Sequence, residues 1–149
     1  MTKSDANAVL NRLLAILNRS LPMYLADAVP WCHPGDEQAK LALALLVTDY
    51  RHYVGRLTEM LLSRRQLIDF GDFPMAFTDT HDLSLDYLLS ELIYYQKQDI
   101  AAIGQCIAAL AGDPAAHSLA EEISGNASGH LEALEELATQ STSAPAAGS

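Results

Sequence analysis

The sequence contains two cysteines, Cys32 and Cys106, and they lie in different segments. They form no CxxC pair, so no disulfide framework is indicated. No uninterrupted apolar run reaches about 18 residues, so we expect no membrane-spanning helix. The first ten residues also lack the apolar core of a signal peptide. Together these absences predict a protein of the reducing cytoplasm.

Basic residues are scarce. The chain has 9 Lys and Arg against 19 Asp and Glu, which gives a formal net charge of −10. Such a surface would release few counterions from a phosphate backbone, so nucleic acid is excluded as an expected partner. The acidity also argues against binding to an anionic membrane surface.

Strand patterns are absent as well, and what the chain does contain is helical periodicity. Ala and Leu, which are strong helix formers, dominate the composition. Four amphipathic segments carry apolar residues at helical spacing; they cover about residues 4–29, 37–68, 83–110 and 114–139. This pattern predicts an all-α domain over residues 1–139. The small polar stretch "QSTSAPAAGS" at 140–149 predicts a disordered tail.

Two proline positions refine these segments. Pro22 lies inside the first segment and should kink it, because proline lacks an N–H and its ring crowds the previous turn. Asp113-Pro114 is a start signal for the fourth segment, with the aspartate as cap and the proline in the first turn.

The connection between the second and third segments is long, whereas the other two connections are short. Residues 69–82, "DFGDFPMAFTDTHD", provide enough chain to travel the length of a bundle. A four-helix bundle with one long helix 2–3 crossover has the ferritin-like topology. An up-down-up-down bundle with an ordered middle loop is the alternative. The apolar stretch "FPMAF" (73–77) is expected to pin this connection to the bundle, or else to form a partner-docking patch.

Three stretches carry a family resemblance: "LNRLLAILNRSLPMYLADA" (10–28), "TDYRHYVGRLTEMLL" (48–62) and "SGHLEALEEL" (128–137). They resemble the first, second and fourth helices of bacterioferritins, and the similarity extends over about residues 9–137. This resemblance implies a bundle in which helices one and three each supply a Glu. Helices two and four would each supply a Glu-x-x-His, and the six side chains would hold two irons that are oxidised by oxygen.

Most of the acids implied by the resemblance are missing. The helix-one acid falls at Leu17, the helix-three acid near Gln96, and the helix-four acid at Ala127. The helix-four histidine is present as His130. One acid, Asp49, therefore remains where the family has four. Since carboxylate charge stabilises a pair of iron cations, the resemblance supports the fold but not the diiron chemistry.

Asp49 and His52 match the acid and histidine of helix two. A carboxylate and an imidazole three residues apart on a helix can reach one metal ion. From the centre of this segment's apolar stripe, however, Asp49 lies about 80° away and His52 about 140° away. A change in register of one residue would put Tyr50 and Tyr53 in the ligand positions instead. The pair is therefore either half of a metal site or a polar pair at the boundary of the helix.

His130 lies on the apolar stripe of the fourth segment, and Gln96 and Asp99 lie on that of the third. A buried carboxylate must be paired or must take up a proton, so Asp99 is expected to pair with His130 or with a tyrosine. One interpretation is a buried polar network that specifies the core. The other is a mononuclear site for iron or another divalent metal, with Asp49, His52, Asp99 and His130 as candidate ligands.

Two functions follow from these patterns. The first is a ferritin-like bundle that has lost most of its diiron ligands and acts as a non-catalytic structural, interaction or small-ligand-binding protein. The second is a metal-binding or iron-oxidising protein of the bacterioferritin type with an altered site. The missing acids favour the first, in which the chain is not an enzyme. Tyrosines and leucines on a second face of the first two segments favour a homodimer.

Overall fold

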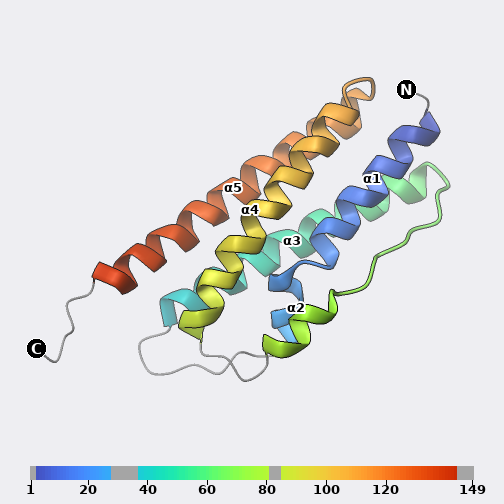
Figure 1. Ribbon diagram of the computed structural model, residues 1–149. Coiled ribbons are helices and arrows are strands. Elements are labelled where there is room, and N and C mark those ends of the chain that lie inside the picture. The colour runs from blue at the N-terminus through green and yellow to red at the C-terminus, as the bar shows by residue number, and fades with distance from the viewer. Residues whose placement is uncertain (1–2, 28–36, 81–84, 144–149) are drawn as a thin grey trace, which may run out of the picture.

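The computed structural model describes residues 3–27, 37–80 and 85–143. Every regular element within these residues is a helix, which confirms the predicted all-α class (Figure 1). None of these helices is long and apolar enough to cross a membrane. The elements are α1 (Lys3–Asn18), α2 (Leu21–Asp27), α3 (Glu37–Ser63), the 3-10 helix η1 (Met75–Thr80), α4 (Leu85–Ala109) and α5 (Pro114–Ser143).

The first predicted segment is two helices rather than one kinked helix. α1 ends at Asn18 and α2 begins at Leu21. Pro22 has no N–H to donate to the carbonyl of Asn18, and its ring crowds that carbonyl. The Ser20 hydroxyl donates to the carbonyl of Leu17 at 2.7 Å and satisfies one of the carbonyls at the end of α1. The proline therefore produces a complete break in the helix.

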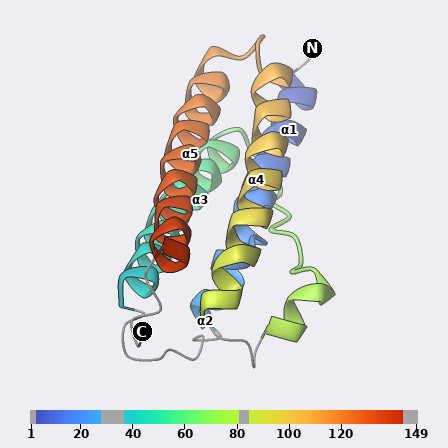
Figure 2. The same cartoon turned by 60° about the vertical axis from the view of Figure 1, so that its left-hand side comes forward.

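The four long helices form a bundle in which α1 and α5 are diagonal to each other, as are α3 and α4 (Figures 1 and 2). Apolar side chains from every helix meet in its interior, as the helical spacing predicts. Burying one such leucine stabilises the fold by roughly 1.5–3 kcal/mol. The fully buried leucines include Leu10, Leu13, Leu14 and Leu17 of α1, Leu46, Leu57 and Leu61 of α3, and Leu88 of α4.

α3 stops at Ser63, well before the predicted end near residue 68. Arg65 takes the left-handed conformation, with φ 58°. Its N–H donates to the carbonyl of Leu62 at 2.9 Å, and the N–H of Gln66 donates to the carbonyl of Leu61 at 3.0 Å. This pair of hydrogen bonds is a Schellman cap, which usually has glycine at the left-handed position. An arginine there gives no signal in the sequence that the helix ends.

The start of α5 agrees with the prediction, whereas its end does not. The carboxylate of Asp113 accepts a hydrogen bond from the N–H of Ala116 at 3.2 Å, so the aspartate caps the helix that begins at Pro114. The helix continues to Ser143, beyond the predicted end near Thr139. The rest of the expected tail, residues 144–149, lies outside the described residues.

One end of the bundle is tied together by Arg64, which follows α3. Its guanidinium donates to Asp113, in the turn between α4 and α5, and to Asn7 near the start of α1. α3 and α4 therefore end at the same end of the molecule and run in the same direction. The connection between them has to return along the bundle, and Figure 2 shows it on the outer side of α1.

Residues 64–80 follow α1 through specific contacts. The Asn11 side chain exchanges two hydrogen bonds of 2.9 Å with the backbone of Asp69. Farther along, the Asn18 amide donates to the carbonyl of Phe70 at 3.3 Å. Phe77 is buried and packs against Tyr24 of α2, with ring centroids 5.8 Å apart. The expectation that "FPMAF" pins the connection is confirmed for Phe77.

Gly71 and Gly55 offer a pair of substitutions with opposite expected effects. Gly71 has φ +78°, and an added Cβ would lie 3.4 Å from the Cβ of Ala15. Gly71→Ala is expected to destabilise the fold by about 1–2 kcal/mol, because alanine pays for the left-handed conformation. Gly55 is in α3 with nothing near its Cβ position. Gly55→Ala is expected to stabilise by about 0.5–1 kcal/mol. Urea unfolding measures both, and equal signs would contradict this description of the connection.

Candidate functional site

The three positions where the resemblance places acids lie in the interior. Leu17 and Ala127 are fully buried, and Gln96 is 1% exposed. The Gln96 amide nitrogen donates to the carbonyl of Ala127 at 3.1 Å. An interior glutamine on α4 is therefore used to join α4 to α5.

Asp49 of α3 and His130 of α5 meet at the edge of the bundle. Nε2 of His130 lies 2.7 Å from Oδ2 of Asp49, so the tautomer with its hydrogen on Nε2 donates to the carboxylate. The side-chain amide of Asn126 donates to the same oxygen at 2.8 Å. The Asn126 hydrogen bond lowers the pKa of Asp49, partial burial opposes this, and His130 lowers the pKa further. The Asp49 side chain keeps 42% of its surface exposed, so water reaches the pair.

His52 does not point into the bundle. It is exposed, and its ring lies edge-on against Tyr53 with centroids 5.3 Å apart. Tyr50 and Tyr53 are the residues of this turn that face inward. The Tyr53 hydroxyl donates to Glu122 of α5 at 2.9 Å. The register with Tyr50 and Tyr53 turned toward the bundle is therefore the one adopted.

Asp99 forms neither of its two expected pairs as a hydrogen bond. His130 is bonded to Asp49, and both Oδ2 of Asp99 and the Tyr50 hydroxyl lack a hydrogen-bond partner. Asp99 instead lies near the Tyr50 hydroxyl, whose pKa is raised by burial and then by the Asp99 charge. Burial raises the pKa of Asp99 to about 7, although the positive charge of Arg19 opposes this effect. Asp99 is thus a carboxyl group that changes charge near neutral pH.

The four candidate metal ligands therefore do not converge. Asp49 and His130 are in contact, His52 lies outside, and Asp99 belongs to a separate interior cluster. Among the residues that the structure describes, no group of three or more His, Cys, Asp or Glu side chains could hold a metal ion.

Asn126 is the residue that the sequence reasoning missed. It precedes His130 by four positions, so the two share one face of α5. That spacing was the available signal, since a polar side chain one turn before a boundary histidine can bind the same partner. Asn126 turns the pair of Asp49 and His130 into a three-residue hydrogen-bonded group.

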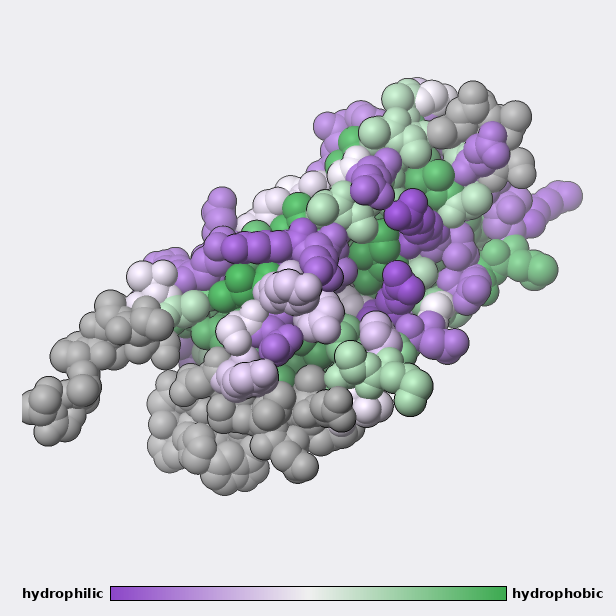
Figure 3. All heavy atoms as spheres, in the orientation of Figure 1, coloured by the Kyte–Doolittle hydropathy of each residue, from purple (hydrophilic) through white to green (hydrophobic). Residues whose placement is uncertain are grey.

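Two of the hollows on the surface are lined by residues outside the polar pair and the interior cluster. A groove of about 290 Å³ between α3 and α5 is lined by Leu41, Leu45, Ala133 and Leu137, among others. A hollow of about 510 Å³ at the end of the bundle surrounds Arg64 and Asp113, whose charges already pair with each other. On the face shown in Figure 3, hydrophilic side chains cover much of α1 and α4, with hydrophobic ones between them. The first hollow is therefore apolar and open, and the second is a structural tie.

These features define a helical-bundle protein with a polar pair at its edge and a polar cluster in its interior. Comparisons with protein-family models, curated proteins and solved structures found no match to this chain.

Proposed function

We propose that the chain is a ferritin-like bundle that has given up diiron chemistry and acts without catalysis, as a structural, interaction or small-ligand-binding protein. The parallel course of α3 and α4 supports the ferritin-like topology, because it requires one long connection between them. The contacts of that connection with α1 through Asn11 and Asn18 support it further.

The observation that carries this proposal is the hydrogen bond from Gln96 to the carbonyl of Ala127. It occupies the level of the bundle where the resemblance implies metal-binding acids. Leu17 from α1 is fully buried. Neutral and apolar side chains contribute packing and one interhelical hydrogen bond, but no negative charge for a cation. A bundle so arranged retains its shape without a metal ion.

The test is the metal content of tag-free protein, measured together with Fe(II) oxidation under oxygen. We expect less than about 0.1 metal per chain and no oxidation above buffer, since the interior lacks carboxylate charge. Asp49→Asn and His130→Ala serve as matched variants, because each removes one partner of the edge pair. Near-stoichiometric metal that either variant loses would overturn the proposal.

One observation favours a second function, divalent-metal binding at an altered site. Asp49 and His130 are both metal-ligand types and lie 2.7 Å apart at a position that water reaches. A metal would have to replace the hydrogen bond between them and recruit further ligands from solvent. The same metal measurement with the two variants decides between the two functions.

The first interaction that we propose is with a second copy of the chain, in a homodimer. Leu41 and Leu45 of α3 are 59% and 53% exposed beside the apolar groove, which supports an outward contact of this helix. Tyr50 and Tyr53 make no such contribution, because they face the bundle. The dimer prediction thus rests on the leucines.

Light scattering at micromolar concentration tests the dimer. We expect twice the 16.1 kDa mass of one chain. The double substitution Leu41→Ser and Leu45→Ser should shift the protein toward monomer by removing apolar contact area. Leu67→Ser is the control, since Leu67 is 99% exposed on the connection, away from the groove. A monomer mass for the unsubstituted chain would end this hypothesis.

A further inference from the structure

Among the described residues, four buried side-chain atoms have no hydrogen-bond partner. One is Oδ1 of Asn126, beside the edge pair, and the other three are the hydroxyl of Tyr50, Oε1 of Gln96 and Oδ2 of Asp99. Tyr50 and Gln96 are 0% and 1% exposed. Buried polar atoms in native proteins nearly always have a partner, either in the protein or in an ordered water molecule. Unpartnered atoms that come close together therefore indicate a bound molecule.

The three atoms belong to one cluster between diagonal helices. Gln96 and Asp99 are three residues apart on α4, so their side chains share one face of that helix. Tyr50 comes from α3, and its hydroxyl lies near both α4 side chains, because the charge of Asp99 raises its pKa and the Gln96 side chain lowers it. Since α3 and α4 are diagonal, the cluster lies near the centre of the bundle.

The orientation of the Gln96 amide is fixed by its other half. Its nitrogen donates to the carbonyl of Ala127, and exchanging nitrogen and oxygen would break that bond and set two acceptors against each other. Oε1 is therefore an acceptor directed away from Ala127. When Asp99 is ionised, Oδ2 is an acceptor as well. Of the three unpartnered atoms, only the Tyr50 hydroxyl then carries a hydrogen to donate.

One donor and two acceptors match a molecule that accepts one hydrogen bond and donates two. We propose that the cluster of Tyr50, Gln96 and Asp99 binds one structural water molecule, which accepts from the Tyr50 hydroxyl and donates to Oε1 of Gln96 and Oδ2 of Asp99. Buried waters typically make about three hydrogen bonds to groups that are otherwise unsatisfied. A metal ion fits less well, because it would use the oxygen of Tyr50 and leave the phenolic hydrogen without an acceptor.

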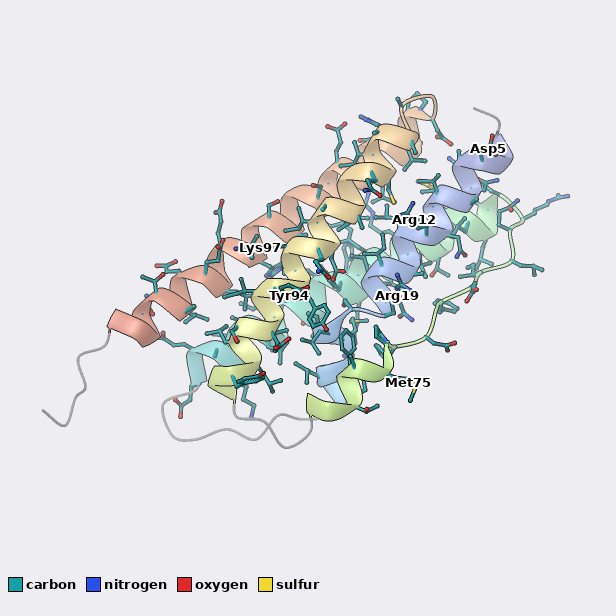
Figure 4. The ribbon with its side chains drawn as sticks, viewed as in Figure 1. Asp5, Arg12, Arg19, Met75, Tyr94 and Lys97 are labelled. Carbon is teal, nitrogen blue, oxygen red and sulfur yellow. The ribbon has the colours of Figure 1, made fainter. Side chains whose placement is uncertain are left out.

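The cluster has one side nearer to solvent than the others. Asp99 is only partly buried, so one side of the cluster is near the surface. Arg19, whose positive charge acts on Asp99, belongs to the turn between α1 and α2. Figure 4 shows Arg19 at the end of α1, and Tyr94 and Lys97 on α4. Asp99 is therefore the member of the cluster nearest to solvent, while Tyr50 and Gln96 are enclosed.

The first test is a crystal structure of the full chain at a resolution that shows ordered water. We expect one peak about 2.7–3.0 Å from all three atoms. In Tyr50→Phe the water loses its only donor, so its occupancy should fall by half or more. Tyr94→Phe is the matched control, because Tyr94 is 56% exposed on the same helix as Gln96. It should leave the peak unchanged.

A measurement in solution tests the bound water on the unsubstituted chain, so it does not depend on whether Tyr50→Phe folds. Magnetisation transfer from water to the Tyr50 ring hydrogens is expected in the unsubstituted chain at pH 8. An enclosed ring without such transfer, together with no electron-density peak, would overturn the proposal. A peak with oxygen distances of about 2.0–2.6 Å would overturn it as well, because it would identify a metal ion. Manganese or rubidium soaks with anomalous scattering would check that outcome. The absence of a peak would overturn the water proposal alone, whereas a metal peak would also count against the proposed function, which the metal-content measurement tests separately.

Discussion

Asp99→Asn is expected to make the folded chain more stable at pH 8 by up to about 4 kcal/mol. Burial raises the pKa of Asp99 from 3.8 to about 7, whereas in the unfolded chain the group has its ordinary value. Between these values the folded state holds a proton that the unfolded state has released. The free energy of unfolding therefore falls as the pH rises, by about 1.4 kcal/mol for each pH unit. Asparagine carries no charge, so its variant lacks this loss.

The pH dependence is the diagnostic part of this prediction. The two proteins should have similar stability near pH 4 and should diverge up to about pH 7, above which the difference stays constant. Tyr50 faces Asp99 from α3, and Arg19 faces it from the turn after α1, so both are kept unchanged in the comparison. A water molecule bound at the cluster would stabilise the charged form and make the difference smaller.

Urea unfolding followed by circular dichroism between pH 4 and pH 8 measures the difference. Asp72→Asn is the control, because Asp72 is exposed on the connection and its substitution removes the same single charge from the acidic chain. Parallel stability curves for the unsubstituted chain and Asp99→Asn would show that Asp99 is not buried as described. A destabilised variant at pH 8 would contradict the prediction outright.

The sequence predicts most of the helices because apolar residues at helical spacing form one face of a helix, and the bundle interior is built from those faces. α3 is an example, because Leu46, Leu57 and Leu61 recur at helical spacing in the sequence and are all fully buried. The start of α5 is predictable because Asp113-Pro114 forms a local cap. Such features depend on residues a few positions apart, and the chain can be read for them directly.

Features that depend on distant residues are not predictable in this way. Arg65 ends α3 in a conformation that usually calls for glycine, and its neighbour Arg64 is at the same time held by Asp113 and Asn7. The bonds between Asn11 and Asp69 join residues 58 positions apart. Neither contact leaves a periodic signal in the sequence.

The candidate site shows the same limit within one helical turn. Asp49 and Tyr50 are neighbours whose side chains are separated by about 100° around the axis of α3, so the rotation of the helix decides which of them faces the interior. Tyr50 faces the interior. Burying its ring stabilises the fold more than burying a carboxylate that would have to be paired. Asp49 then stayed at the edge, where His130 and Asn126 reach it. The sequence supplied the polar residues but not their partners.

The second large effect is expected at Asp113. Its carboxylate caps α5 through the N–H of Ala116 and receives two hydrogen bonds from Arg64, at 2.6 and 3.2 Å. The side chains of Arg64 and Asp113 retain 24% and 17% of their surface, so the ion pair is largely shielded from water. Asp113→Ala removes the cap and leaves Arg64 without its carboxylate. We expect it to lower the free energy of unfolding by about 3 kcal/mol.

Asp113→Asn separates the two contributions, because its amide oxygen can still cap α5 but carries no charge for Arg64. Its expected cost is about 2 kcal/mol, because it keeps the cap, whose loss alone costs about 1 kcal/mol. Arg64→Met combined with Asp113→Asn should cost less than the sum of the single variants, because the two residues act on each other. Urea unfolding at one pH completes this double-mutant cycle. It compares the unsubstituted chain, Asp113→Asn, Arg64→Met and the double variant. A cost below about 0.5 kcal/mol for Asp113→Ala is what a surface substitution without structural role would give. That result would mean that the end of the bundle is held by apolar packing alone.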